Sequence, residues 1–231
     1  MPAVDRLLAD LRAVFGPRLI SVVVYGRHAV DRPASPQPIH TLALVGDLTI
    51  HDLDATARLA RGWQAAGLAV PLMLTRLDFA RSLDVFPLEL GAIIDAHRVV
   101  HGADPFAGLH VPRQDVRRAC EIDIKGHLLH LREAYVETFG ELDAIAALVE
   151  ASAAALRTLA ANVARLDGRP WSPATALSAH LSEALGPEHG RALGAVLALG
   201  DAPIAGADAA RLFPQYLAAV EALSAYVDAW S

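Results

Sequence analysis

Apolar residues open the chain at the spacing of an α-helix and then give way to strand patterns. The helical set is Val4, Leu7, Leu8, Leu11 and Phe15. An uninterrupted apolar run over residues 19–25 ends at Gly26, which predicts a buried strand followed by a turn. Residues 31–38 contain three prolines and predict a loop, and IHTLALVGD behind them predicts a second strand. We expect residues 19–25 and 41–45 to be adjacent strands at the centre of a sheet.

Further helices and strands complete the first half of the chain. The sequence HDLDATARLARGWQAAG predicts a helix that stops at Gly67. Residues 70–75 predict a third strand that leads into a short helix through Phe79, and HRVVHG predicts a last extended piece. The order helix, strand, strand, helix, strand indicates a mixed α/β arrangement.

The hydrophobic pattern changes after GADPFAGLHVP. Apolar residues then recur at helical spacing over more than five turns: Val116, Cys120, Ile124, Leu128, Leu131 and Tyr135. More alanine- and leucine-rich helical patterns follow, separated by short punctuated connections, which favour a bundle of about four or five helices. The predicted fold class is therefore α+β, with a mixed-sheet domain over residues 1–108 and an all-α helical bundle over residues 109–231.

Composition and charge narrow the class of partners. The chain has 231 residues, of which 54% are hydrophobic, and a formal net charge of −6. We therefore expect a globular protein without the basic field that non-specific nucleic-acid binding or an anionic membrane surface requires. The single cysteine, Cys120, excludes an intrachain disulfide. Glu150 and Arg157 interrupt the alanine-rich stretch 144–164, so we expect no membrane span there and a cytoplasmic location.

The order of elements around Gly26 resembles a known family. A helix, a strand that ends in glycine, a loop of about a dozen residues and a second strand are similar to the nucleotidyltransferase fold of the DNA polymerase β superfamily. The resemblance is to its small bacterial form, the kanamycin and minimal nucleotidyltransferase group, which often carries a helical C-terminal domain. The stretch from RSLDVFPLELGAIIDAHRVVHGADPFAGL through CEIDIKGHLLHLREAYV also resembles bacterial nucleotidyltransferase-like proteins, so the resemblance covers roughly residues 1–140.

The resemblance implies a particular phosphoryl-transfer chemistry. In the family, a glycine-serine turn cradles a triphosphate, and carboxylates on the next strand hold two Mg²⁺ ions that bridge the attacking and leaving oxygens. Gly26 matches the turn glycine, but Arg27 stands at the serine position. The two acids, one residue apart, should fall at one of two pairs of positions, which here hold Ile39 and Thr41 or His40 and Leu42.

Other acidic residues do not replace the missing pair. Asp31 lies in the proline-rich loop, and Asp47 lies too far along the second strand. Asp52 and Asp54 form an acid-x-acid pair where a helix should begin, which is typical of a helix cap. The third acid of the family should come from residues 70–75, which contain none. We therefore expect no metal site and a loss of metal-dependent catalysis.

The candidate site residues follow from this comparison. Gly26, Arg27 and His28 are predicted to bind a nucleotide or another anion, because backbone N–H groups and a guanidinium both suit phosphate. Kanamycin-type enzymes place a catalytic base from their helical part at the site, and Glu121 is the candidate for that role. The alternative for Glu121 is a solvated ion pair with Lys125 four residues later.

A histidine pair on the same predicted helix gives a further metal-site hypothesis. His127 and His130 are spaced so that both could chelate a metal ion, but no third ligand is evident. A partly exposed pair that binds no metal is the favoured interpretation.

Three hypotheses of different class remain open. The first is a non-catalytic nucleotidyltransferase-like protein that binds a nucleotide, an anion or a protein partner and needs no cofactor. The second is an active enzyme that uses Mg²⁺ and transfers NMP from NTP to a small molecule or a protein. The third is a structural or oligomerisation module. Residues 144–164 and 192–199 are apolar on more than one side, which indicates either core or interface, and we expect a homodimer through the helical region.

Overall fold

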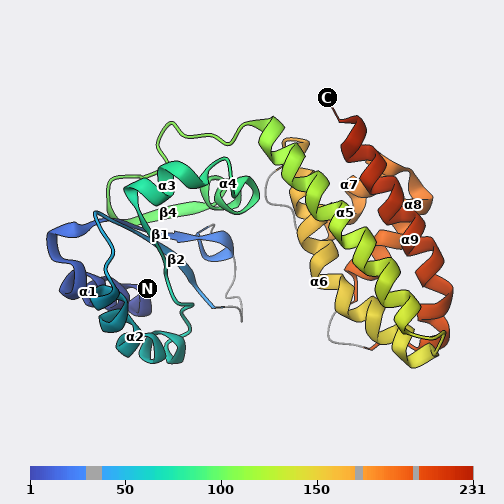
Figure 1. Cartoon of the computed structure of the whole chain (residues 1–231), viewed down its shortest axis with the longest axis horizontal. Helices are drawn as coiled ribbons and strands as arrows, with labels where there is room; N and C mark the ends of the chain where they lie inside the picture. Colours follow the sequence, from blue (N-terminus) through green and yellow to red (C-terminus); the bar gives the residue numbers. More distant parts are fainter. Residues whose placement is uncertain (30–37, 170–173, 200–202, 231) are drawn as a thin grey trace. The chain divides into compact units, whose positions relative to one another are not determined.

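The chain folds into two compact units, residues 1–111 and residues 112–231, in a computed structural model (Figure 1). The structure describes residues 1–29, 38–169, 174–199 and 203–230. The predicted loop 31–38, including Asp31, lies outside the described residues except for Pro38. The sequence predicts a change of domain at residue 108, and the two units divide after residue 111.

A four-stranded mixed sheet organises the first unit. Its strands are β1 (Leu19–Tyr25), β2 (His40–Val45), β3 (Leu72–Thr75) and β4 (His97–Gly102), in the order β3-β2-β1-β4. β1 runs antiparallel to both β2 and β4, whereas β2 and β3 are parallel. The predicted adjacency of β1 and β2 and the predicted mixed sheet are both confirmed.

One face of the sheet packs against α1 (Pro2–Phe15) and α2 (Ile50–Ala65). β1 is joined to α1 by a short 3₁₀ turn, η1 (Gly16–Arg18). Alternate residues of β1 and β2 meet the apolar sides of the two helices in a buried cluster that includes Val22, Val24, Ala43, Leu7, Leu11 and Trp63. The periodic apolar residues of the N-terminal segment therefore form the helix face that the sequence predicts.

The opposite face of the sheet is covered as well. Short helices α3 (Arg76–Ser82) and α4 (Pro87–Asp95) lie on it, and its core cluster comprises Val23, Leu42, Leu44, Phe79, Leu90, Ile93 and Phe106. Because both faces are buried, β1 and β2 are apolar at successive positions rather than at alternate ones. Because helices cover both faces of the sheet, the side chains of β2 near the predicted active site are mostly buried.

The second unit is all-helical in the part that the structure describes. Its helices are α5 (Arg113–Glu137), α6 (Leu142–Leu166), α7 (Ala174–Leu185), α8 (Pro187–Leu197) and α9 (Gly206–Ala229). The predicted bundle of about four or five helices is confirmed. An aromatic group strengthens its core: Tyr135 stacks on Phe213 at 4.2 Å between ring centroids, and Tyr216 meets the edge of Phe213.

Helix α6 is the one described helix that is long and apolar enough to cross a membrane by length and composition alone. In the structure it packs against α5, α8 and α9, and residues along its whole length, from Ile145 to Leu166, are buried in the bundle. α8 buries Leu193, Val196 and Leu197 in the same core. From the sequence, residues 144–164 and 192–199 could belong either to the core or to an interface. In the structure their apolar residues lie largely in the core.

Candidate functional site

The turn after β1 is the first candidate site. A short 3₁₀ turn, η2 (Gly26–His28), follows Tyr25, and Gly26 has a φ of +72°, which favours glycine. The Gly26 N–H donates to the Ala96 carbonyl at 2.8 Å, which fixes the turn to the residue that precedes β4. Arg27 is exposed, and within the described part of the chain no hydrogen bond or ion pair engages its guanidinium. The turn thus presents a cation at the end of a rigid strand.

The beginning of β2 lies beside this turn. His40 pairs with Tyr25 in the sheet register, and the two rings are 5.7 Å apart between centroids. His40 is exposed and Ile39 is half-buried, whereas Thr41 and Leu42 are fully buried. Leu42 lies in the apolar cluster under α3 and α4.

These β2 residues do not fit a pair of divalent cations. Mg²⁺ takes oxygen ligands, usually carboxylates and phosphates, and no carboxylate stands at the four positions. A carboxylate at position 41 or 42 would be buried in an apolar core, where the charged form is strongly disfavoured. The four positions of β2 at which the resemblance expects the paired acids therefore supply no carboxylate ligand for a metal ion.

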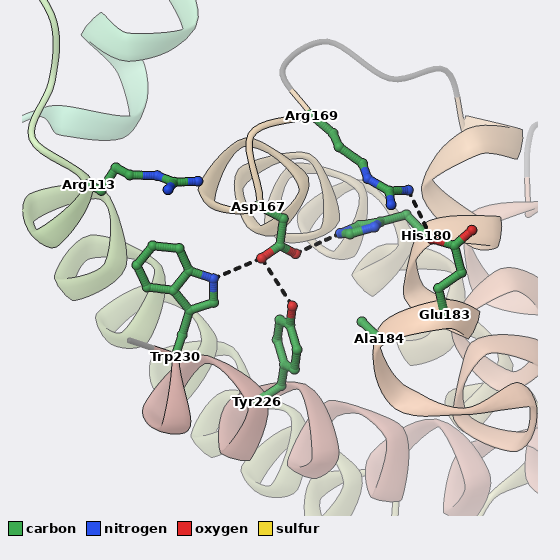
Figure 2. A pocket seen from close by; sticks show the side chains of 8 residues that line it. All are labelled: Arg113, Asp167, Arg169, His180, Glu183, Ala184, Tyr226 and Trp230. Atoms are coloured by element: carbon green, nitrogen blue, oxygen red, sulfur yellow. Dashed lines mark hydrogen bonds and ion pairs between the residues drawn. The ribbon is translucent and has the colours of Figure 1, made fainter.

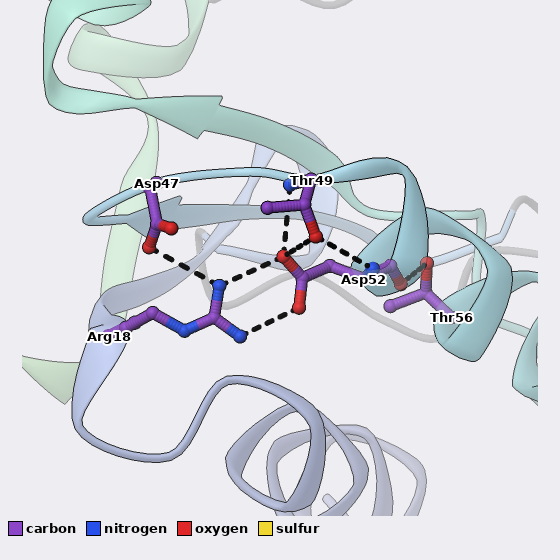
Figure 3. A network of polar contacts seen from close by, with 5 residues as sticks. All are labelled: Arg18, Asp47, Thr49, Asp52 and Thr56. Atoms are coloured by element: carbon purple, nitrogen blue, oxygen red, sulfur yellow. Dashed lines mark hydrogen bonds and ion pairs between the residues drawn. The ribbon is translucent and has the colours of Figure 1, made fainter.

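Of the acid-x-acid pair at the start of α2, Asp52 caps the helix, whereas Asp54 is exposed. Asp52 and Thr49 form a capping box: the Thr49 hydroxyl accepts from the Asp52 N–H, and the Asp52 carboxylate accepts from the Thr49 N–H at 2.9 Å (Figure 3). The side chain of Asp52 is only 4% exposed. The prediction that this acid caps a helix is confirmed.

Arg18 completes the network around Asp52 (Figure 3). Its two terminal nitrogens donate to the two carboxylate oxygens of Asp52 at 2.9 and 2.7 Å, and one of them also donates to Asp47 at 3.2 Å. The hydrogen bonds from Arg18 and then Thr49 hold the pKa of Asp52 well below its usual range, and those to Asp52 and Asp47 raise the pKa of Arg18. Arg18 thus engages both Asp47 and Asp52.

A pocket in the helical unit is the second candidate site (Figure 2). It has a volume of about 410 Å³ and is centred on Asp167, the residue that ends α6. The Asp167 carboxylate accepts three hydrogen bonds, from His180 at 2.8 Å, Trp230 at 2.8 Å and Tyr226 at 3.0 Å. Burial, followed by the bond to Asp167, raises the pKa of Tyr226.

The rim of this pocket carries paired charges. Arg113 lies over the Trp230 ring at 5.1 Å and donates to the Leu166 carbonyl, and Arg169 forms an ion pair with Glu183 at 3.0 Å. These contacts join α5, α6, α7 and α9 around the pocket. The sequence alone does not predict this cluster, because its residues are spread from position 113 to position 230 and share no motif.

The remaining predicted residues lie on α5. Glu121 forms ion pairs with Lys125 at 2.5 Å and with Arg117 at 3.2 Å, and Lys125 also reaches Asp228 of α9 at 3.0 Å. The predicted ion pair is therefore present and extends to a neighbouring helix. A role for Glu121 as a catalytic base stays a prediction.

The histidine pair on α5 has separate surroundings. His127 forms a hydrogen bond with the Tyr216 hydroxyl at 2.8 Å, while His130 is exposed beside Glu133. Burial lowers the pKa of His127. Among the described residues, no group of three or more His, Cys, Asp or Glu side chains is placed to hold a metal ion.

The mixed sheet with its glycine turn, followed by an all-helical unit, defines a nucleotidyltransferase-like fold. Among solved structures, spectinomycin adenyltransferase AAD(9) from Enterococcus faecialis, crystallised with ATP and spectinomycin, matches with a TM-score of 0.61 and 12% sequence identity. The match covers 98% of each chain. No protein-family model and no curated protein matches the sequence. At this identity the likeness shows the fold, and the predicted fold resemblance is confirmed.

Proposed function

We propose that this protein binds a nucleotide or another phosphate-bearing anion at Gly26, Arg27 and His28 and does not catalyse metal-dependent nucleotidyl transfer. The resemblance matches Gly26 to the turn at which the family holds a triphosphate, and this supports the proposal. The observation that carries the proposal has two parts: within the described residues no hydrogen bond or ion pair engages the Arg27 guanidinium, and the β2 strand beside the turn offers no carboxylate. A guanidinium binds phosphate oxygens without a metal.

The chemistry of transfer explains why binding and catalysis separate here. Two metal ions align the attacking and leaving oxygens and neutralise the charge that develops on them, and their carboxylate ligands are essential to that arrangement. One arginine attracts a phosphate but neither activates a nucleophile nor aligns it. Adenine nucleotides are the first ligands to test, because the structurally similar AAD(9) was crystallised with ATP.

An active nucleotidyltransferase is the alternative, and one observation favours it. The likeness to AAD(9), an adenyltransferase, extends over nearly the whole of both chains. In that case NTP and Mg²⁺ would be required, NMP would pass to a small molecule or a protein, and acids other than those at β2 would have to hold the metal. A structural or oligomerisation module that binds no nucleotide is the third possibility.

One incubation experiment distinguishes these three hypotheses about function. The full chain is incubated with ATP labelled in the α-phosphate, Mg²⁺ or Mn²⁺ and candidate acceptors, and bound and transferred label are counted separately. We expect bound label and no transfer. Transfer to an acceptor would establish the active enzyme, and the absence of both bound and transferred label would favour the structural module.

A further inference from the structure

A cavity in the first unit lies at the end of the sheet opposite to Gly26. Its volume is about 380 Å³, and its lining includes Ile20 at the start of β1 and Leu44 near the end of β2. β3 and β4 end at the same edge of the sheet, because both run in the direction of β2. At the rise of a strand, the chain from Ile20 to Gly26 spans about 20 Å. The cavity is therefore separate from the turn at which we propose nucleotide binding.

Three apolar side chains line the cavity. They are Ile20, Leu44 and Phe79, which belong to the core cluster under α3 and α4, and the last two are buried. Phe79 also packs on Phe106, with 5.4 Å between the ring centroids. An apolar group that enters the cavity would leave water and contact these side chains. The lining thus favours a ligand with an apolar body.

The segment that follows β4 also lines the cavity and is fixed against β1. The Ser21 hydroxyl donates to the Ala103 carbonyl at 2.8 Å, and Ser21 is buried. At Gly102 the two strands approach so closely that an added Cβ would lie 2.0 Å from the Ile20 carbonyl oxygen. Asp104 therefore comes from a segment whose backbone is held in place before any ligand binds. Such preorganisation lowers the cost of ordering the site on binding.

Asp104 brings a carboxylate to the cavity with one of its oxygens unengaged. Its Oδ1 accepts from the Phe106 N–H at 2.9 Å and lies 3.1 Å from His97 Nε2. Within the described residues, no hydrogen bond or ion pair uses its Oδ2. The side chain is 40% exposed, and each oxygen of an ionised carboxylate is a hydrogen-bond acceptor. An ammonium group in the cavity could therefore donate to Oδ2 while the contacts of Oδ1 stay in place.

Arg76 brings a cation to the same cavity. It is the first residue of α3, whose start is fixed by a capping box between Thr75 and Asp78. Arg76 is exposed, and in the part of the chain that the structure describes no hydrogen bond or ion pair engages its guanidinium. It does not pair with Asp104, although both residues line the cavity. The cavity thus presents a cation and an anion that do not neutralise each other.

We propose that this cavity binds a zwitterion with an apolar body, the chemistry of an apolar amino acid or a short apolar peptide. The Arg76 guanidinium holds the carboxylate of the ligand, Asp104 holds its ammonium group, and the apolar lining contacts its body. A ligand with a single charge would leave one of these two protein groups without a partner. Cavities of roughly 300–1,000 Å³ with a mainly apolar lining and a few polar groups are typical small-molecule sites. The proposal does not depend on nucleotide binding at Gly26.

The first test varies the ligand. The full chain is titrated by calorimetry with L-leucine and with leucyl-leucine, which carry the same two charges at different separations and so distinguish an amino acid from a peptide. We expect one of them to show saturable binding at millimolar concentration or below. Its N-acetyl and carboxamide derivatives, which each lack one charge, should each bind about tenfold or more weakly. Absence of saturable binding by both compounds, or equal affinity of the zwitterion and its two derivatives, would overturn the proposal.

The second test varies the protein, with circular dichroism to verify that each variant is folded. Arg76→Ala should weaken binding of the zwitterion about tenfold or more but leave binding of its carboxamide unchanged, because the carboxamide has no carboxylate to contact Arg76. By the same reasoning, Asp104→Asn should weaken binding of the zwitterion and leave binding of the N-acetyl derivative unchanged.

Arg81→Ala is the matched control for Arg76→Ala. Arg81 is another exposed arginine of α3, and it does not line the cavity. The control should bind the zwitterion as the wild type does. Equal weakening by Arg76→Ala and Arg81→Ala, or an equal effect of Arg76→Ala on the zwitterion and on its carboxamide, would contradict the proposed site.

Discussion

The guanidinium of Arg18 donates hydrogen bonds to both carboxylate oxygens of Asp52, at 2.9 and 2.7 Å. The two residues are 34 positions apart in the sequence. This contact fixes the turn before β1 to the first turn of α2, on the side of the sheet where α1 also packs. The contact also argues against Asp52 and Asp54 as a pair of metal ligands, because Asp52 already accepts hydrogen bonds from Arg18 and Thr49. Asp52 thus stabilises the fold.

Arg18→Met should lower the stability of the first unit and weaken its dependence on acid. The folded-state pKa of Asp52 lies below its ordinary value of 3.8, so its contribution is complete above about pH 4 and is lost as the pH falls further. Without Arg18 the folded-state pKa of Asp52 returns toward its ordinary value, because the hydrogen bond from Arg18 is the largest cause of the lowered pKa. We expect the melting temperature of the variant to be lower at pH 7 and to converge on that of the wild type only as the pH falls through the lowered folded-state pKa of Asp52. Parallel melting curves at all pH values would contradict this account of Asp52.

Arg27→Ala should weaken ATP binding by about tenfold or more, the effect of losing one charge-assisted interaction with phosphate. Arg61→Ala is the matched control, because Arg61 is another exposed arginine of the same unit, on α2. We expect the control to bind ATP as the wild type does in an equilibrium titration. Equal weakening in both variants would indicate a general charge effect and not a site at the turn.

Asp167→Ala should destabilise the helical unit by about 2–4 kcal/mol, because it leaves three buried or half-buried donors without their acceptor. Asp167→Asn retains one carbonyl oxygen for Tyr226 and Trp230 and should cost less. Urea denaturation followed through tryptophan fluorescence measures both, since Trp230 reports on this cluster. If the two variants were equally stable, the hydrogen bonds would not be what holds these helices together.

Gly102→Ala should be much more destabilising than Gly108→Ala. Both glycines have a φ of +76°, but an added Cβ at Gly102 would lie 2.0 Å from the Ile20 carbonyl oxygen, whereas none of the surroundings of Gly108 comes within 4 Å. We expect about 1 kcal/mol for Gly108→Ala from backbone strain alone and at least about 2 kcal/mol more for Gly102→Ala. Equal losses in a denaturant titration would show that β4 can shift away from β1.

Much of the first unit could be predicted because its elements are encoded locally. The apolar runs of β1 and β2 and the glycine that ends β1 lie in short segments whose pattern admits one interpretation. The cap at Asp52 was equally local, since its partner Thr49 lies three residues away. Its second partner, Arg18, could not be predicted, because nothing in the sequence relates the end of one turn to a helix that begins 32 residues later.

The helical unit was harder to interpret in detail. An alanine-rich helix such as α6 is apolar on most sides, and periodicity alone does not tell a core side from an exposed one. The Asp167 cluster depends on tertiary packing that brings His180, Tyr226 and Trp230 together.

The measurement that tests the central claim most directly is a calorimetric titration of the full chain with ATP, once with Mg²⁺ and once with EDTA. Two observations predict that ATP binds in both buffers with similar dissociation constants: β2 has no carboxylate, and no hydrogen bond or ion pair engages the Arg27 guanidinium within the described part of the chain. Binding that requires Mg²⁺ would contradict the account, because it would mean that other residues of this chain hold the metal and that the protein retains the requirements of an active nucleotidyltransferase.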